Sequence, residues 1–301
     1  LSQHWGAPFL GCEWGTPEYG QAYGRVVAAL TDHLAANGWL DEAYTYWYDE
    51  PDAPDYPFVC EGMGVLKSAD PRLKRLLTEQ YEPGLDGCAD IWSPILDQYD
   101  PSWAHARQDL GEQVWWYVCT GPKAPYPNDF IDHPGIEHRV RYWMAWQYGV
   151  QGDLFWDTTY WTNGELFTDE DPQDPWTDPA SYSTWGGYVS NYGNGDGRLL
   201  YPPRGWKDGL DRIEGPVPSL RWELIREGIE DYEYFALLKE AADELERRHK
   251  SPKLAAQARG LLAVPSDVFT TLVAYTGDPA PLAAHRQKLA ACLEKIEKKL
   301  R

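Results

Sequence analysis

Residues 44–51 read YTYWYDEP, an aromatic-rich run that ends in Asp49, Glu50 and a proline. Aromatic and β-branched residues favour extended backbone, so the run predicts a strand over residues 44–48. A helix is predicted just before it, over residues 19–37, because apolar residues recur there at helical spacing and an Asn-Gly pair ends the pattern. The strand therefore presents two adjacent carboxylates where it ends.

The alternation of helix and strand continues along the chain. Further strands are predicted over residues 88–92, 113–119, 152–156 and 198–201, and further helices over 71–77, 101–110 and 136–148. A long loop is predicted over 157–196, and the C-terminal part is predicted to be helical over 219–248, 254–262, 267–275 and 281–300. About five alternations indicate a parallel sheet with helical crossovers.

Acidic and aromatic residues gather at the ends of these strands, which favours an α/β fold of the (β/α)₈ TIM-barrel type, whose sites lie at that face. The predicted strands are fewer than eight. Either residues 1–18 contain more structure than the pattern reveals, or the first strands lie upstream of Leu1, which we favour. We therefore predict a barrel catalytic domain over 1–250, lacking its first strands, and a helical extension over 251–301. An upstream segment or a second chain would complete the barrel.

The charge of the chain excludes some partners. The 301 residues carry 27 basic and 47 acidic side chains, a net charge of −20. Such a chain repels nucleic acid and anionic lipid, and no apolar run reaches the roughly 18 residues that a membrane span needs. Residues 207–301 are neutral, so the whole negative charge lies in residues 1–206, which also hold 15 of the 16 tryptophans.

Asp49 and Glu50 are the strongest candidates for chemistry. Glycoside hydrolysis uses pairs of carboxyl groups, one of which acts as the acid. Adjacent residues on a regular strand point to opposite faces, so both can reach one sugar only if the strand ends or bulges there, as Pro51 indicates. The alternative is two surface acids in a loop.

Two stretches resemble glycoside hydrolase family 123, the β-N-acetylgalactosaminidases and their uncharacterised bacterial relatives. Residues 44–51 resemble the catalytic strand end, and residues 193–234 (GNGDGRLLYP, then GPVPSLRWELIREGIEDYEY) resemble the end of the barrel and the helix after it. The resemblance covers roughly residues 19–240. It implies that Glu50 is the acid/base and that Asp49 orients the substrate's own 2-acetamido group, which attacks the anomeric carbon to give an oxazoline intermediate and net retention.

Other strand-end residues are candidates for the sugar pocket: Tyr46, Trp47, Trp92, Trp116, Tyr117, Trp156, Asp157, Asn194, Asp196 and Tyr201. A ring can stack on the apolar face of a sugar, but barrel interiors are full of bulky side chains, so core packing remains the alternative for each ring. The polar residues Asp157, Asn194 and Asp196 are the better candidates, because they have less structural reason to lie there.

The remaining signals are weak. The five cysteines are an odd number with no C-x-x-C pair, so neither a zinc site nor a disulfide framework is predicted. Most of them are predicted to be small buried residues. The acidic residues in 169–178 could bind calcium, but a solvated acidic loop is favoured. Residues Gly193–Gly197 are predicted to form a tight turn. No metal and no cofactor is predicted.

The sequence therefore predicts a retaining glycoside hydrolase that removes β-linked N-acetylgalactosamine, or a close 2-acetamido sugar, from a glycan by substrate-assisted catalysis. One alternative is a glycosidase on a different sugar, with Glu50 as acid and another strand-end acid such as Asp157 as base or nucleophile. Another is a carbohydrate-binding barrel without turnover. The compartment stays open: an extracytoplasmic or secreted bacterial location is favoured over the cytoplasm.

Overall fold

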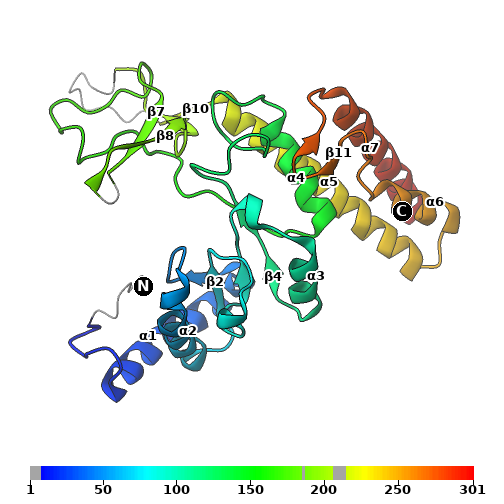
Figure 1. The fold of residues 1–301 in the computed structure, drawn as a ribbon. Coiled ribbons are helices and arrows are strands. Elements are labelled where there is room, and N and C mark those ends of the chain that lie inside the picture. The colour runs from blue at the N-terminus through cyan, green and yellow to red at the C-terminus, as the bar shows by residue number, and fades with distance from the viewer. Residues whose placement is uncertain (1–7, 185–186, 206–214) are drawn as a thin grey trace. The chain divides into compact units, whose positions relative to one another are not determined.

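The computed structural model describes residues 8–184, 187–205 and 215–301 (Figure 1). The chain forms two compact units. Unit 1 is made of Leu1–Tyr117 and Val150–Leu154, and unit 2 of Val118–Gly149 and Phe155–Arg301. Each unit is described separately below.

Unit 1 is built on short parallel strands with helices between them. In chain order its elements are α1 (Pro17–Ala36), β1 (Tyr44–Tyr46), α2 (Tyr56–Ala69), β2 (Lys74–Leu77), β3 (Ile91–Trp92), α3 (Pro101–Asp109), β4 (Gln113–Val114), β5 (Trp116–Tyr117) and β6 (Asp153–Leu154), with short 3₁₀ turns η2 (Leu40–Glu42), η3 (Ala53–Asp55), η4 (Pro83–Leu85) and η5 (Leu96–Gln98). The first four strands form a sheet in the order β1-β2-β3-β4, and β5 pairs with β6, all in parallel. The carboxyl ends of β1 to β4 therefore lie along one edge of the sheet.

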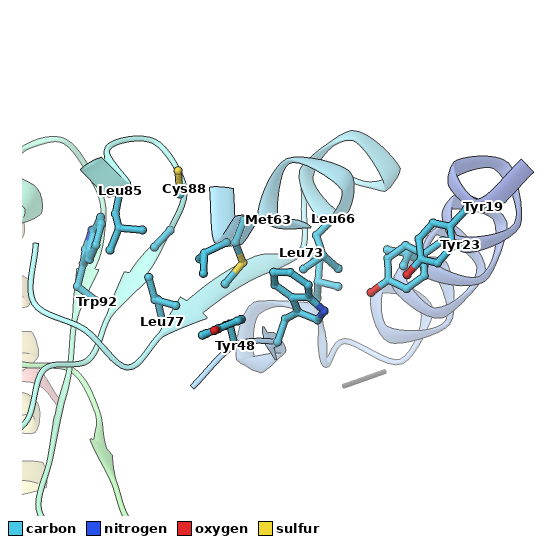
Figure 2. Close-up of a cluster of buried hydrophobic side chains, with 14 residues drawn as sticks. Tyr19, Tyr23, Tyr48, Met63, Leu66, Leu73, Leu77, Leu85, Cys88 and Trp92 are labelled. Atoms are coloured by element: carbon cyan, nitrogen blue, oxygen red, sulfur yellow. The ribbon is translucent and has the colours of Figure 1, made fainter. Parts of the chain in front are cut away.

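The core of unit 1 is aromatic. The helix α1 begins at Thr16, whose hydroxyl accepts a hydrogen bond from the Tyr19 amide at 3.2 Å, an ordinary N-cap. Its buried face, which includes Tyr19 and Tyr23, belongs to the same hydrophobic cluster as Tyr48, just beyond β1, and Leu77 of β2 (Figure 2). Burial of these side chains supplies the main stabilisation of the unit and fixes where β1 ends.

Unit 2 combines hairpins with a group of packed helices. Its elements are α4 (Glu137–Tyr148), β7 (Ala180–Ser183), β8 (Ser190–Asn194), β9 (Leu200–Tyr201), β10 (Val217–Pro218), α5 (Leu220–Arg247), α6 (Pro252–Leu261), β11 (Phe269–Thr271), β12 (Ala274–Tyr275) and α7 (Ala280–Leu300). The long helix α5 packs against α4, α6 and α7 (Figure 1). The fully buried Asp231 of α5 accepts hydrogen bonds from Arg139 at 2.5 Å and Trp143 at 2.7 Å, both on α4, so its charge is compensated inside the helical core.

Most predicted elements are confirmed, but two predicted helices are wrong. Residues 74–77 form strand β2, and the helix lies earlier, as α2. A strand covered on both faces has consecutive apolar residues, which cannot be told from a buried helix by periodicity. Residues 267–275 contain the hairpin β11-β12, and the predicted loop 157–196 contains the antiparallel pair β7-β8.

Two parts of the prediction for the cysteines are wrong, because a disulfide forms and most of the five cysteines are only partly buried. Cys60 of α2 and Cys88, which follows η4, form a disulfide with their Cα atoms 5.0 Å apart, while Cys12, Cys119 and Cys292 are not disulfide-bonded. The two bonded residues are 28 positions apart in the sequence, so no spacing motif marks them. They meet because α2 lies beside η4.

The described residues support a mixed α/β fold with parallel strands and a helical C-terminal part. A closed eight-stranded barrel is not formed among the residues that the structure describes, and the predicted boundary at residue 250 remains a prediction. The segment 251–301 packs with α5 in unit 2. None of the helices described here has the length and apolarity that crossing a bilayer would require.

Candidate active site

The acidic pair lies where β1 ends. Strand β1 ends at Tyr46, after which Trp47 and Tyr48 are buried, whereas Asp49 and Glu50 are exposed. The Trp47 ring stacks on Trp14 with centroids 5.9 Å apart. It also lies against Gly62 of α2, where an added Cβ would come within 2.1 Å of the indole. This anchoring holds the chain in the core up to Tyr48 and leaves the two carboxylates at the surface.

The backbone turns sharply at Glu50. This residue has a φ of +43°, in the left-handed region that residues other than glycine rarely adopt. Side chains therefore stop alternating between the two faces of the strand at this pair. This allows two adjacent acids to reach the same site.

Three side chains hydrogen-bond the pair. The Tyr46 hydroxyl donates to Asp49 Oδ1, and Thr78 Oγ1 donates to the same oxygen at 2.9 Å. The Tyr117 hydroxyl, at the end of β5, donates to Glu50 Oε1. Within the described parts of the chain, Asp49 Oδ2 and Glu50 Oε2 accept no hydrogen bond from protein. Each carboxylate thus has one oxygen held by the protein and one available to a ligand.

A third carboxyl group, Glu79, completes an acid-rich edge. Glu79 follows Thr78 just beyond β2, and burial, together with the nearby charges of Glu82 and Glu50, raises its pKa to about 7. None of these three acids takes part in an ion pair among the described residues. Burial and the adjacent Asp49 also raise the pKa of Tyr46, so its hydroxyl stays a hydrogen-bond donor. The edge therefore gathers three carboxyl groups, and Glu79 is the one whose pKa is raised to about 7.

The raised pKa of Glu79 predicts a pH-dependent stability. The pKa of Glu79 is about 7 in the folded chain, against an ordinary value of 4.5. At pH values between these two, the folded chain binds more protons than the unfolded chain, so the contribution of Glu79 to the free energy of unfolding falls as the pH rises. At pH 8 we expect the free energy of unfolding of E79Q to exceed that of wild type by about 1 kcal/mol, a figure that allows for screening of the carboxylate by solvent. Near pH 4.5 this difference should vanish. Urea unfolding of both proteins at the two pH values measures this. A gain of equal size at both values, or the same behaviour in the surface control D97N, would contradict the assignment.

The other predicted residues of unit 1 divide into two groups. Tyr46 and Tyr117 contact the pair. Trp47, Trp92 and Trp116 are almost completely buried, which fits the alternative of core packing, and a sugar-binding role for these three rings stays a prediction. Trp92, for instance, donates its indole N–H to Glu112 Oε2 at 2.5 Å inside the unit. The sequence alone cannot tell an aromatic side chain that points into the core from one that points out of the strand end.

In unit 2, the predicted residues Trp156 and Asp196 are in contact. The Trp156 indole, 40% exposed, donates to Oδ1 of the buried Asp196 at 3.1 Å, and burial raises the pKa of Asp196 to about 6. Gly197, with a φ of +68°, allows this approach, because a Cβ there would lie 2.5 Å from the indole. The predicted tight turn is confirmed for residues 195–197, where the Arg198 amide donates to the Gly195 carbonyl at 3.1 Å, whereas Gly193 and Asn194 belong to strand β8.

The last three predicted residues have local partners in unit 2. Asp157 Oδ1 accepts the Thr159 amide at 2.7 Å, and Asn194 donates to Asp132 at 2.8 Å. The ring of Tyr201 lies 4.8 Å from that of Trp176. Because Asp157 stabilises its own turn, it is a weak candidate for a catalytic base. A sugar-binding role for any of these residues stays a prediction.

Sequence reasoning missed Thr78 and Glu79. The signal for them is a polar pair, Thr-Glu, directly after the apolar residues 76–77, and it is ambiguous because those apolar residues also fit a helix. No group of three or more His, Cys, Asp or Glu side chains in the described part of the chain could hold a metal ion.

The comparison with known families decides the identity of this domain. The catalytic domain of glycoside hydrolase 123 matches residues 7–238. The chain belongs to glycoside hydrolase family 123. The matched region contains Asp49, Glu50 and the stretch 193–234, so the family resemblance of the sequence is confirmed.

A solved family 123 glycoside hydrolase from Clostridium perfringens, described in connection with glycolipid glycan hydrolysis, has a similar fold. The two chains are 18% identical with a TM-score of 0.53, and the match covers 94% of this chain and 45% of that one. This family 123 chain therefore spans less than half the length of that relative. No curated protein matches the sequence.

Proposed function

We propose that this family 123 chain is the catalytic part of a retaining glycoside hydrolase. It removes β-linked N-acetylgalactosamine, or a close 2-acetamido sugar, from a glycan by substrate-assisted catalysis. The observation that carries the proposal is the pair Asp49 and Glu50, each with one oxygen held by the protein and one unengaged, in a domain of this family.

Glu50 is the acid/base in this proposal. Its protonated carboxyl gives a proton from Oε2 to the glycosidic oxygen as the bond to the anomeric carbon breaks, while Tyr117 holds Oε1. The same carboxylate then takes a proton from water, which attacks the anomeric carbon in the second step. Burial of Tyr117 and its hydrogen bond to Glu50 limit the rotation of the carboxyl group.

Asp49 is the group that orients the acetamido substituent. Its free Oδ2 accepts the acetamido N–H, which turns the carbonyl oxygen toward the anomeric carbon. As that oxygen attacks, positive charge develops on the oxazoline-type ring, and the Asp49 carboxylate stabilises it. Two hydroxyl donors on Oδ1 keep the carboxylate in place. Because attack occurs twice at the same carbon, the anomeric configuration is retained.

Further substrate contacts are part of the proposal. The exposed and oriented Trp156 is the best candidate for stacking on a sugar face, and Asp157, Asn194, Asp196 and Tyr201 are candidates for hydroxyl contacts. A complete (β/α)₈ barrel, closed by an upstream segment or a second chain, would provide the walls of the pocket.

A substrate panel tests the proposed function. We expect the chromogenic β-N-acetylgalactosaminide to be hydrolysed, the β-N-acetylglucosaminide to be hydrolysed at a rate set by contacts to the C4 hydroxyl, and the plain β-galactoside to be inert. Without a 2-acetamido group the substrate has no internal nucleophile. Hydrolysis of the galactoside at a comparable rate would contradict the proposal. Sugar binding without any product would favour a carbohydrate-binding protein.

A further inference from the structure

Thr78 is a buried polar residue at the acidic edge. Tyr46 of β1 pairs with Leu76 of β2, and Thr78 lies two residues after Leu76. Only 3% of Thr78 is exposed. A buried hydroxyl needs hydrogen-bond partners, since it gains nothing from burial by itself. The Thr78 hydroxyl contacts both members of the acidic pair and lies 3.3 Å from the Tyr46 hydroxyl, which also holds Asp49, so its role differs from the packing of the neighbouring Leu77.

One oxygen atom of Thr78 contacts both members of the pair. Oγ1 donates its proton to Asp49 Oδ1 at 2.9 Å and accepts the backbone N–H of Glu50 at 2.8 Å. These two roles are compatible, because a hydroxyl has one proton to donate and lone pairs to accept with. The hydroxyl therefore links the side chain of Asp49 to the main chain of Glu50.

The backbone contact falls at the unusual turn. Glu50 has a φ of +43°, a conformation that persists at a residue other than glycine only when the surroundings hold it in place. The Glu50 amide that Thr78 accepts belongs to the peptide group joining the two acids. The link thus fixes both the turn and the carboxylate that precedes it.

We propose that Thr78 is the positioning residue that holds Asp49 and Glu50 in their relative geometry for catalysis. The inference rests on the proposed function, in which these two residues orient the acetamido group and transfer the proton. Thr78 itself touches no substrate atom. It acts by fixing the turn from which both carboxyl groups project.

Three variants test the role of Thr78. T78V keeps the shape of the side chain and loses both hydrogen bonds, and T78S keeps the hydroxyl. T45V is the matched control, because the Thr45 hydroxyl also bonds across β1 and β2, to the Lys74 carbonyl at 3.1 Å, without touching the pair. We expect T78V to lower kcat on a β-N-acetylgalactosaminide by about 100-fold with KM changed less than about threefold, since small misplacements of reacting groups cost about that much. T78S and T45V should retain most of the activity.

Amide hydrogen exchange gives a second readout that needs no turnover. The Glu50 amide should exchange about tenfold faster in T78V than in wild type, and at the wild-type rate in T78S and T45V. If wild type hydrolyses no acetamido sugar, the proposed function fails, whereas the exchange rates still test the link. The inference is overturned if T78V keeps wild-type kcat, if T78S loses as much activity as T78V, or if exchange of the Glu50 amide is the same in all four proteins.

Discussion

Replacing Glu50 by Gln is expected to lower kcat on a β-N-acetylgalactosaminide by about 10³-fold, within the range that loss of a general acid produces. Gln preserves the shape of the side chain, and its carbonyl oxygen can still accept the hydrogen bond from Tyr117. It has no acidic proton to give to the leaving oxygen and cannot take one from water. Steady-state kinetics at one pH measures the loss.

The control for this variant is E61Q, which removes a carboxylate from an exposed position on α2. We expect E61Q to behave as wild type and E50Q to bind the sugar with little change in affinity. If E50Q stayed within about tenfold of wild type, the acid/base would have to be another residue.

Replacing Asp49 by Asn is expected to lower kcat by about 10²- to 10³-fold, the range found when one group that stabilises transition-state charge is lost. The Asn carbonyl can replace Oδ1 as acceptor for Tyr46 and Thr78. Its NH₂ group then faces the acetamido N–H, so two donors oppose each other, and the negative charge that stabilises the oxazoline-type intermediate is absent. Kinetics on the same substrate measures the loss.

D52N is the matched control for Asp49, since Asp52 is an exposed acid three residues farther along the same segment. We expect D52N to lose less than about fivefold in kcat, because it accepts nothing from the substrate in this account. A D49N variant as active as D52N would show that the acetamido group is oriented by some other residue.

The acidic pair could be predicted from sequence because its context is local. Residues 44–48 form an aromatic-rich run, of which Tyr44–Tyr46 are strand β1, and a proline follows the two acids directly. The hydrogen-bonding environment of the pair could not be predicted in the same way. Thr78 directly follows the neighbouring strand β2, whose apolar residues also fit a helix. Tyr117 lies on a strand and is 67 residues away from Glu50 in the sequence.

The sequence also does not show whether an aromatic side chain on a strand points into the core or toward solvent. Trp92 and Trp116 lie on strands beside polar residues, as sugar-stacking rings do, yet both point into the core, whereas Trp156 is exposed. Composition and alternation do not distinguish these cases when a strand is buried on both faces. The Cys60–Cys88 bond was unpredictable for a similar reason, because it depends on α2 lying beside η4 and not on spacing.

Some of the acidic residues in 1–206 lie close together at one edge of the sheet in unit 1. Asp49, Glu50, Glu79 and Glu82 gather at the edge where β1 and β2 end, and the described residues supply no ion-pair partner for them. Burial, and after it the nearby charges of Glu82 and Glu50, raise the pKa of Glu79 at this edge.

The most direct test of the central claim is the rate of wild-type hydrolysis on β-galactosaminides that differ only in the 2-acyl group. Fluorine withdraws electrons from the amide oxygen, so a mechanism in which that oxygen attacks predicts a steep fall in kcat from acetyl through fluoroacetyl and difluoroacetyl to trifluoroacetyl, by about 10²-fold overall. A kcat that stays constant across the series would contradict participation of the acetamido group, and with it the role proposed for Asp49.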